Sequence, residues 1–355
     1  MADKSVAIVI LAAGQGSRMQ SDLPKVLHRL AGVPLVGHAL SVARTVDPEQ
    51  VIVVAGHGAD QVTKAVGKID PDARIVLQSE QLGTGHAVRQ ALPELEGFEG
   101  KVIVLYGDTP FIGEETLAAL AAHPSDLVVL GFEAEDPGRY GRLIVTSRGL
   151  ERIVEFKDAD AATREIALCN SGVMALDASL LRQLIVRLTN ENASGEYYLT
   201  DLVALARAEG RSTDVVTCDE SETLGINTRA ELAGAEAAFQ DRARRQALLA
   251  AAGIALLAVF AAGFDLLYHI TWWWDWSPRE RYLVTLVESV GEMASTGTIM
   301  LTCLWFAFRQ IRLRRSLRRG RGRPLASPAR SMTGMTGPAD TPQTGLVDRR
   351  RRDAG

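Results

Sequence analysis

Short apolar runs that alternate with longer amphipathic stretches constrain the fold of this chain more than any other feature. The runs are rich in β-branched residues and lie at residues 6–11, 51–55, 75–77, 102–106 and 127–130. Such runs are typical of strands buried on both faces of a parallel sheet. The stretches between them, among them 34–45 and 85–95, are long enough for crossover helices. The pattern predicts an α/β fold with a doubly wound, mostly parallel sheet over residues 1–230.

The loops that follow these strands are where the sequence predicts a ligand site. In doubly wound sheets, ligands bind beyond the carboxyl ends of the strands, which here means after Leu11, Ala55 and Tyr106. The first of these loops contains two glycines, Gly14 and Gly16. Glycines let backbone N–H groups approach a phosphate closely, and a following helix N-terminus adds partial positive charge. We therefore expect this loop to hold phosphates.

Two cations follow the glycines of the first loop. Arg18 and Lys25 lie close enough in sequence to neutralise the charge that develops when a triphosphate is split. The spacing of the glycines is neither that of a P-loop nor that of a dinucleotide-binding fingerprint. The loop therefore indicates phosphate chemistry of another class.

Composition indicates a folded chain in a reducing compartment. Of the 355 residues, 47% are hydrophobic and 23% are charged, which excludes a disordered or collagen-like chain. The three cysteines, Cys169, Cys218 and Cys303, are far apart. Their spacing indicates neither a disulfide framework nor a cysteine zinc site.

The C-terminal third has a different texture. We expect a linker helix at 231–245, two apolar helices within 246–311 and a disordered, arginine-rich tail at 312–355. Residues 246–264 are 19 residues without a charge, which is enough to cross a bilayer. A second apolar stretch, 282–308, is interrupted only by Glu288 and Glu292.

The two apolar stretches predict a membrane hairpin on the cytoplasmic face of the cell membrane. Four tryptophans lie between the stretches, as in an interfacial belt, and arginines flank both outer ends. Membrane lipid would then be a partner. The alternative is a soluble cytoplasmic protein whose helical hairpin is buried inside an oligomer, so the oligomeric state is open. We expect no nucleic acid partner.

Several motifs together give a specific resemblance. The segment LAAGQGSRMQSDLPK at 11–25 resembles the signature of sugar-1-phosphate nucleotidyltransferases, with Ser17 in place of the usual threonine. Further matches are found in QSEQLGTGHA at 78–87, LYGDTP at 105–110, YGR at 140–142, IVE at 153–155, CNSG at 169–172, EYYLTD at 196–201 and GIN at 225–227. In this order they look like the uridyltransferase half of the bifunctional N-acetylglucosamine-1-phosphate uridyltransferases, over about residues 5–245.

This resemblance implies a site for UTP, N-acetylglucosamine-1-phosphate and Mg²⁺. It assigns catalysis to Arg18 and Lys25, and the metal to Asp108 and Asn227, whose hard oxygens suit Mg²⁺. The residues that it assigns to the uridine nucleotide are Leu11, Ala12, Ala13, Gly14, Gln78, Gly83 and Thr84. Those that it assigns to the sugar are Gly141, Glu155 and Asn170. Further substrate contacts fall on Lys25, Tyr106, Gly107, Asp108 and Asn227.

The resemblance stops near Gln246. The second half of that family is a left-handed β-helix of hexapeptide repeats that transfers an acetyl group, and no such repeats follow Gln246. We therefore expect this chain to form UDP-N-acetylglucosamine and pyrophosphate but to lack acetyl transfer. A natural domain replacement and a fusion or frameshift both remain open, as do another sugar phosphate as acceptor and a membrane-tethered nucleotide-sugar-binding protein without turnover.

Overall fold

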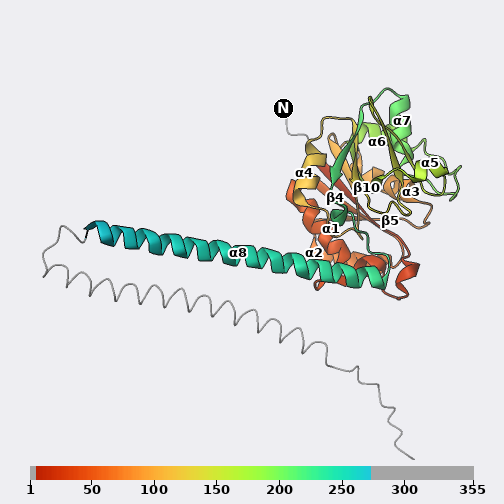
Figure 1. Cartoon of the computed structure of the whole chain (residues 1–355). Helices are drawn as coiled ribbons and strands as arrows, with labels where there is room; N and C mark the ends of the chain where they lie inside the picture. The colour runs from red at the N-terminus through yellow and green to blue at the C-terminus, as the bar shows by residue number, and fades with distance from the viewer. Residues whose placement is uncertain (1–4, 273–355) are drawn as a thin grey trace, which may run out of the picture. The chain divides into compact units, whose positions relative to one another are not determined.

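The computed structural model describes residues 5–272 (Figure 1). The chain divides between residues 255 and 256 into two units, and the sheet lies entirely in the first. This first unit contains nine strands of one mixed sheet. They are β1 (Val6–Ala12), β4 (Gln50–Ala55), β5 (Arg74–Leu77), β6 (Lys101–Tyr106), β7 (Leu127–Glu133), β8 (Arg142–Thr146), β9 (Gly149–Val154), β10 (Leu168–Asp177) and β11 (Thr213–Cys218).

Helices connect most of these strands. They are α1 (Leu35–Ala43), α2 (Ala59–Ile69), α3 (Thr84–Ala91), α4 (Glu114–Ala122), α5 (Ala161–Arg164), α6 (Ala178–Ile185), α7 (Asp201–Ala208) and α8 (Arg229–Trp272). Short 3₁₀ helices η1 (Ser17–Met19) and η2 (Lys25–Leu27) follow β1, and a small ribbon joins β2 (Arg29–Leu30) to β3 (Val33–Pro34).

Four of the five predicted strands form one half of the sheet, and the fifth, β7, lies on the other side of β10. The strand order is β11-β7-β10-β6-β1-β4-β5, and β1 pairs in parallel with both β4 and β6. The register sets Leu11 opposite Tyr106 and Ala12 opposite Ala55, which in turn lies opposite Leu77. The carboxyl ends of four strands therefore meet at one edge, as the strand pattern predicted.

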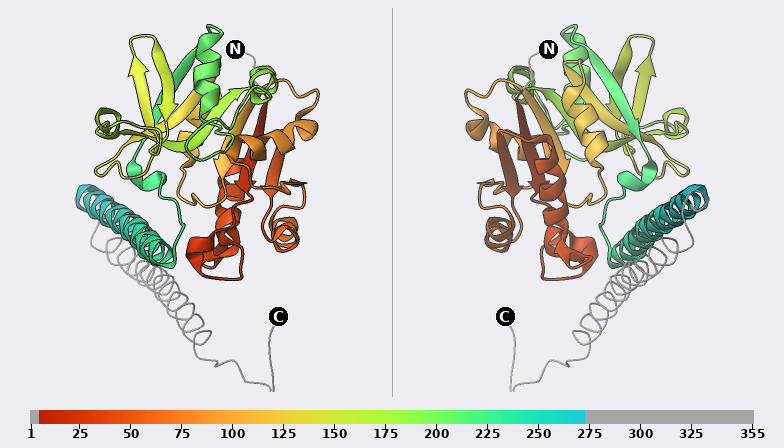
Figure 2. Two further views of the ribbon diagram at one scale, coloured as in Figure 1. Left: turned by 90° about the vertical axis from the view of Figure 1, so that its right-hand side faces the viewer. Right: turned by 90° about the vertical axis from the view of Figure 1, so that its left-hand side faces the viewer.

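The central strand β10 runs against both of its neighbours in the main strand order. β10 is antiparallel to both β6 and β7, and its register is interrupted between Asn170 and Met174. Because β10 runs in the opposite direction, its first residues lie at the edge where the parallel strands end. The antiparallel hairpin β8–β9 joins the sheet through Arg142, which pairs with Cys169 of β10 (Figure 2).

Two hydrophobic cores cover the two faces of the sheet. Alternate residues of β1 point to opposite faces, so Val9 belongs to one core and Ile8 to the other. The first core packs against α3, α6 and α7, whereas the second packs against α1, α2 and α4. Helices on both faces confirm the doubly wound, mostly parallel architecture.

Helix α8 is buried at its beginning and exposed farther along. Ala235 and Phe239 pack with Leu30 and Phe111 in a small separate core. Later apolar side chains are exposed, among them Leu249 and Phe260, each 73% exposed. Among the described residues, Arg229–Ala262 is long and apolar enough to cross a membrane; its most apolar window has a mean hydropathy of 1.8 and no buried residues.

Part of the predicted C-terminal organisation lies outside the described residues. This applies to the second apolar stretch at 282–308, to most of the tryptophan cluster and to the tail at 312–355. The first apolar stretch, 246–264, lies within α8. The second arm of the hairpin stays a prediction.

Candidate active site

The glycine-rich loop begins where β1 ends, at the edge where the parallel strands meet. Gly16 has a φ of 61°, a left-handed conformation that side chains rarely adopt. A Cβ atom at Gly16 would lie 2.6 Å from the Cβ of Lys25. Both the left-handed backbone and the lack of space for a side chain therefore favour glycine at position 16. Its small size lets Lys25 pack directly against the loop.

Three predicted residues from distant parts of the sequence meet beside this loop. The Lys25 ammonium forms an ion pair with the Asp108 carboxylate and donates a hydrogen bond to Asn227 Oδ1 at 3.0 Å. The Lys25 and Asp108 side chains are only 14% and 15% exposed. A carboxylate oxygen and an amide oxygen thus converge on one cation.

The backbone holds these oxygens in place. Asp108 follows β6, and its carbonyl accepts a hydrogen bond from Ile226 N–H at 2.9 Å. The next two N–H groups, of Asn227 and Thr228, donate to the Glu231 carboxylate at 2.6 Å and 3.1 Å. Glu231 lies in the first turn of α8, so this carboxylate closes the helix N-terminus and fixes Asn227.

Arg18 is not brought into this cluster. Its side chain is exposed, and the structure records no ion pair or side-chain hydrogen bond for it among residues 5–272. It lies in the 3₁₀ helix η1, which begins directly after Gly16. Of the two predicted catalytic cations, only Lys25 contacts the other predicted site residues.

Gln78, Gly83 and Thr84, which the resemblance assigns to the nucleotide, lie close together. Gln78 is 3% exposed, and its amide donates to the Gly83 carbonyl at 3.2 Å and lies 3.0 Å from His86 Nδ1. Thr84 Oγ1 accepts a hydrogen bond from Leu199 N–H at 3.1 Å. These contacts fix the wall of the site before any ligand is bound.

Tyr106 separates the loop from the β8–β10 side of the site. Burial raises the pKa of Tyr106, and the carboxylates of Glu155 and Asp108 raise it further, whereas a hydrogen bond with the Thr84 side chain lowers it. The hydroxyl therefore stays neutral at physiological pH. A Cβ atom at Gly172, which has a φ of 92°, would lie 2.7 Å from the Tyr106 ring.

The three residues assigned to the sugar also lie together. Asn170 N–H donates to the Gly141 carbonyl at 2.8 Å, and a Cβ atom at Gly141 would lie 3.5 Å from Glu155 Oε2. Burial raises the pKa of Glu155, while the hydrogen bond from Thr200 Oγ1 to Glu155 Oε1, at 3.0 Å, lowers it. Thr200 belongs to the EYYLTD motif, to which the sequence assigned no role.

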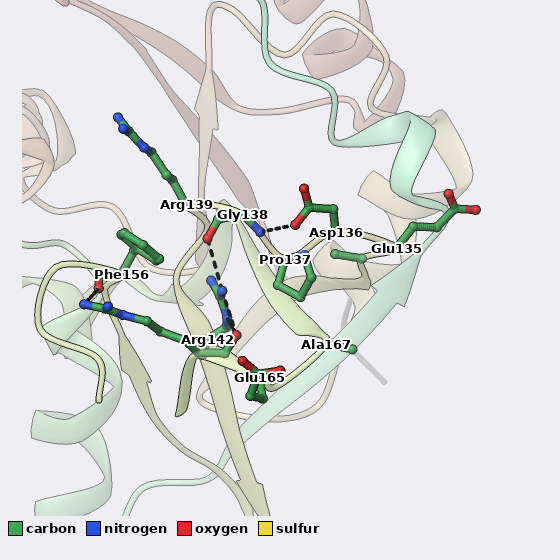
Figure 3. A pocket seen from close by; sticks show the side chains of 11 residues that line it. Glu135, Asp136, Pro137, Gly138, Arg139, Arg142, Phe156, Glu165 and Ala167 are labelled. Atoms are coloured by element: carbon green, nitrogen blue, oxygen red, sulfur yellow. Dashed lines mark hydrogen bonds between the residues drawn. The ribbon is translucent and has the colours of Figure 1, made fainter. Parts of the chain in front are cut away.

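A pocket of about 560 Å³ lies next to β8, away from the glycine-rich loop (Figure 3). None of the predicted site residues lines it. Its lining residues come from the segment after β7 and from the neighbourhood of α5, and they are Ala134, Glu135, Asp136, Pro137, Gly138, Arg139, Arg142, Phe156, Arg164, Glu165 and Ala167. Arg142, to which the sequence assigned no role, is the buried charged member of this set, at 1% exposure.

No group of three or more His, Cys, Asp and Glu side chains within the described residues could hold a metal ion. The predicted ligand pair combines one carboxylate with one amide, which is a smaller donor set. Such a pair suits a hard cation that keeps its waters and binds substrate phosphate oxygens.

Comparisons with known proteins match the part of the chain that contains this site. Residues 8–253 match the profile of the MobA-like NTP transferase domain. The protein named bifunctional protein GlmU of Paracoccus denitrificans (strain Pd 1222) is 73% identical over 248 residues, which are 70% of this chain and 56% of the relative. The GlmU protein of Ruegeria sp. (strain TM1040) is 59% identical over 246 residues, 69% of this chain and 55% of the relative.

The chain thus spans slightly more than half the length of the curated relatives that it matches. The matched part includes the glycine-rich loop, the Lys25 cluster and the β8–β10 side of the site. The resemblance inferred from the motifs is confirmed, and the chain belongs to the family of MobA-like NTP transferase domains, with bifunctional GlmU proteins among its relatives.

Proposed function

We propose that this chain is a uridylyltransferase that converts UTP and N-acetylglucosamine-1-phosphate into UDP-N-acetylglucosamine and pyrophosphate. The observation that carries the proposal is the convergence of Lys25, Asp108 and Asn227 beside the glycine-rich loop. The identity of 73% to a bifunctional GlmU protein supports the same reaction class.

The reaction is an in-line displacement. A phosphate oxygen of the sugar phosphate attacks the α-phosphorus of UTP and forms the new P–O bond. The bond between the α-phosphorus and the oxygen that bridges to the β-phosphorus breaks, and pyrophosphate leaves with the electron pair. Such a transfer needs no covalent enzyme intermediate, so catalysis depends on positioning and on neutralisation of charge.

On the nucleotide side, residues Leu11 to Gly14 bring backbone groups to the triphosphate. Gln78, Gly83 and Thr84 form the wall against the base. The uracil edge offers a carbonyl, an N–H and a second carbonyl, which amide and backbone groups can pair with. This wall is already held by internal hydrogen bonds, so a pyrimidine that matches it loses little freedom in the protein on binding.

Lys25 and Arg18 supply positive charge to the phosphates. Lys25 is held against the loop by the close packing at Gly16. Arg18 lies in η1, directly after the glycine-rich loop, and its exposed side chain can extend toward the leaving pyrophosphate. Cations that meet the developing charge stabilise the transition state more than the ground state.

Asp108 and Asn227 are the residues that would hold a divalent metal, which we propose is Mg²⁺. Their donor chemistry fits, because two hard oxygens already converge on the Lys25 ammonium. When bound there, the ion would neutralise phosphate charge and orient the triphosphate. The chain's own part is to hold both oxygens through the Ile226–Asp108 and Asn227–Glu231 hydrogen bonds.

On the sugar side, Gly141, Glu155 and Asn170 would bind the acceptor, with Gly107 and Tyr106 between the two substrates. A buried carboxylate and amides can pair with sugar hydroxyls and with the N-acetyl group. Thr200 holds one carboxylate oxygen of Glu155, which leaves the second directed toward Gly141.

We further propose that α8 attaches the enzyme to the cytoplasmic face of a membrane. The support is the apolar segment within Arg229–Ala262, whose most apolar window is not buried against the protein. Exposed leucine, valine and phenylalanine side chains on a helix are costly in water and stable in lipid. Membrane lipid would then be the partner of this helix.

The catalytic proposal is tested with the purified full chain and a pyrophosphate-release assay. Release is expected only when UTP, N-acetylglucosamine-1-phosphate and Mg²⁺ are all present, and a chelator should abolish it. The matched reactions replace the acceptor with glucose-1-phosphate or UTP with another nucleoside triphosphate. Equal rates with every acceptor would contradict the assignment of the sugar, and no release with any acceptor would contradict the reaction.

The membrane proposal has a separate test. After cell fractionation, the full chain should remain in the membrane pellet through alkaline extraction, while a chain ending at Arg245 should be soluble. Recovery of the full chain in the soluble fraction would overturn the proposal and favour a helix buried in an oligomer.

A further inference from the structure

Arg142 is a buried cation whose hydrogen bonds, within the described residues, all go to backbone carbonyls, and its guanidinium also lies 6.0 Å from the centre of the Phe156 ring. The residue is 1% exposed, and its guanidinium donates to the carbonyls of Tyr140, Gly138 and Arg164. Figure 3 shows Arg142 beside Gly138, to which it is bonded. The distances are 3.1 Å to Gly138 and 2.9 Å and 3.2 Å to Arg164. Within the described part of the chain, no carboxylate forms a salt bridge with it.

A buried guanidinium of this kind is expensive. Removing a charge from water costs several kcal/mol unless hydrogen bonds and charge partners compensate, and a well-packed apolar side chain is often at least as stable. Carbonyl dipoles satisfy the Arg142 donors but bring no opposite full charge. Arg142 supplies hydrogen bonds to these carbonyls that an apolar side chain could not make, so its contribution lies in fixing the segments that it bonds.

The bonded carbonyls determine the orientation of one particular peptide unit. In a planar trans peptide, the C=O and the following N–H point in opposite directions. Because the Tyr140 carbonyl points to the guanidinium, the N–H of Gly141 must point away from it. The Gly138 carbonyl is held by the same guanidinium, so the turn before Gly141 cannot rotate freely.

The strand register connects this peptide to the sugar side of the site. Arg142 pairs with Cys169 of β10 and with Val154 of β9, each of which immediately precedes a residue assigned to the sugar. Those residues are Asn170 and Glu155. Gly141 lies next to both, because its carbonyl accepts from Asn170 N–H and its Cβ position is 3.5 Å from Glu155 Oε2.

We propose that Arg142 is a positioning residue for the acceptor sugar phosphate. By holding the Tyr140 carbonyl, it fixes the Tyr140–Gly141 peptide so that Gly141 N–H, Glu155 and Asn170 face the acceptor in one geometry. Arg142 acts through the backbone and does not itself touch the substrate. This inference rests on the proposed uridylyltransferase function and deepens it.

The test compares Arg142→Met and Arg142→Lys with the wild-type full chain. Loss of charge-assisted hydrogen bonds that orient a binding group should raise the KM for N-acetylglucosamine-1-phosphate about tenfold in Arg142→Met. The KM for UTP should change less than about twofold. Lysine keeps the charge but not the planar fork, so Arg142→Lys should recover part of the acceptor affinity.

Arg164→Met is the matched control. Arg164 lines the same pocket, but its guanidinium stacks over Phe156 at 4.5 Å and donates to the Phe156 carbonyl. Removing that side chain leaves the carbonyls of residues 138 and 140 bonded to Arg142. Both KM values should therefore stay close to wild type.

Five outcomes distinguish a positioning role from the alternatives. A selective rise in the acceptor KM supports positioning. Equal changes for both substrates, or no change in a folded Arg142→Met variant, would overturn it. Failure of both Arg142 variants to fold would also overturn it, because the role would then be structural. An inactive wild-type chain would instead contradict the proposed function on which the inference rests.

Discussion

The nucleotide side and the sugar side of the site share one edge of the sheet but are built differently. On the nucleotide side, the proposed catalytic and metal-binding residues lie mainly in loops that follow the parallel strands β1 and β6. The sugar side follows the antiparallel strands β8 to β10, where Gly141, Glu155 and Asn170 are held by the strand register. On the first side a cation meets two oxygens, and on the second a buried carboxylate meets a hydroxyl.

Because of this difference, we expect variants on the two sides to change different kinetic constants. Groups on the nucleotide side act on charge that changes during the reaction, so their loss should lower kcat. Groups on the sugar side offer fixed hydrogen bonds to an acceptor, so their loss should chiefly raise its KM. Measurements of kcat and of the acceptor KM for variants on the two sides therefore test this difference.

The largest effect is expected at Asp108. Asp108→Asn weakens one of the two oxygen ligands proposed for the metal and removes the ion pair with Lys25. The rate at saturating substrates should fall about 100-fold or more at ordinary Mg²⁺ concentrations. Asp47→Asn, at an exposed turn, is the matched control. Wild-type rates for Asp108→Asn across a magnesium titration would remove Asp108 from the metal site.

Replacement of the two loop cations should come next. Lys25→Ala and Arg18→Ala should each lower kcat, by about 100-fold for Lys25, because a transition-state charge loses its partner. The acceptor KM should change little. Lys64→Ala, on the exposed face of α2, should retain full activity. A raised KM with intact kcat would move Lys25 or Arg18 to a binding role.

On the sugar side, Glu155→Gln should raise the acceptor KM about tenfold while leaving kcat and the UTP KM nearly unchanged. Because burial raises the pKa of Glu155, the wild-type acceptor KM should also rise as the pH falls through that raised pKa. The sugar phosphate itself titrates near pH 6, so only the part of the pH profile that disappears in Glu155→Gln belongs to this carboxyl group.

The same raised pKa predicts a stability effect with a definite sign. The folded protein binds the Glu155 proton more tightly than the unfolded chain does, so ionisation costs folding free energy as the pH rises above the usual glutamate pKa. The melting temperature of Glu155→Gln should therefore gain on the wild type with increasing pH. A difference that shrinks with pH would contradict the burial of this carboxylate.

A smaller effect is expected from the backbone that forms the nucleotide wall. Gly83→Ala places a Cβ 2.7 Å from the Tyr197 carbonyl oxygen at a φ of 108°, which should cost about 1–3 kcal/mol of unfolding free energy and raise the UTP KM. Gly97 also has a positive φ, 74°, but nothing lies within 4 Å of its Cβ position. Gly97→Ala should cost about 1 kcal/mol and leave both KM values intact.

The smallest effect is expected from truncation after Arg245. In the described part of α8, Phe239 is the last side chain that packs in the small core with Leu30 and Phe111, and Asn227 is fixed by Glu231 near the start of the helix. Steady-state constants in detergent-free buffer should stay within about twofold of the full chain. A large loss of activity would show that the apolar part of α8 supports the site.

The sequence predicted the parallel half of the sheet far better than the antiparallel half. Buried parallel strands are nearly continuous apolar runs, and β1, β4 and β6 all show this pattern. β10 was not predicted, because Asn170, Ser171 and Gly172 interrupt its apolar residues at the irregular register. The β8–β9 hairpin has no strong turn signal of its own and was also missed.

The site was predicted from motifs and not from spacing. The strand pattern placed the loops after Leu11 and Tyr106 at one edge of the sheet. Lys25 is 83 residues from Asp108 and 202 from Asn227, and only the resemblance named these three residues together. Arg142 could not be found in this way, because an arginine in a sequence is usually an exposed side chain. Its role depends on the carbonyls of Gly138 and Tyr140, which only the fold directs toward it.

The reverse reaction is the most direct test of the proposed uridylyltransferase activity. Purified full chain is mixed with UDP-N-acetylglucosamine, pyrophosphate and Mg²⁺, and the phosphorus resonances are followed by NMR. With the wild-type chain, UTP and N-acetylglucosamine-1-phosphate should appear in equal amounts. With Asp108→Asn, the rate should be lower by about 100-fold or more. Unchanged resonances with the wild-type chain, or equal rates for both proteins, would contradict this proposal.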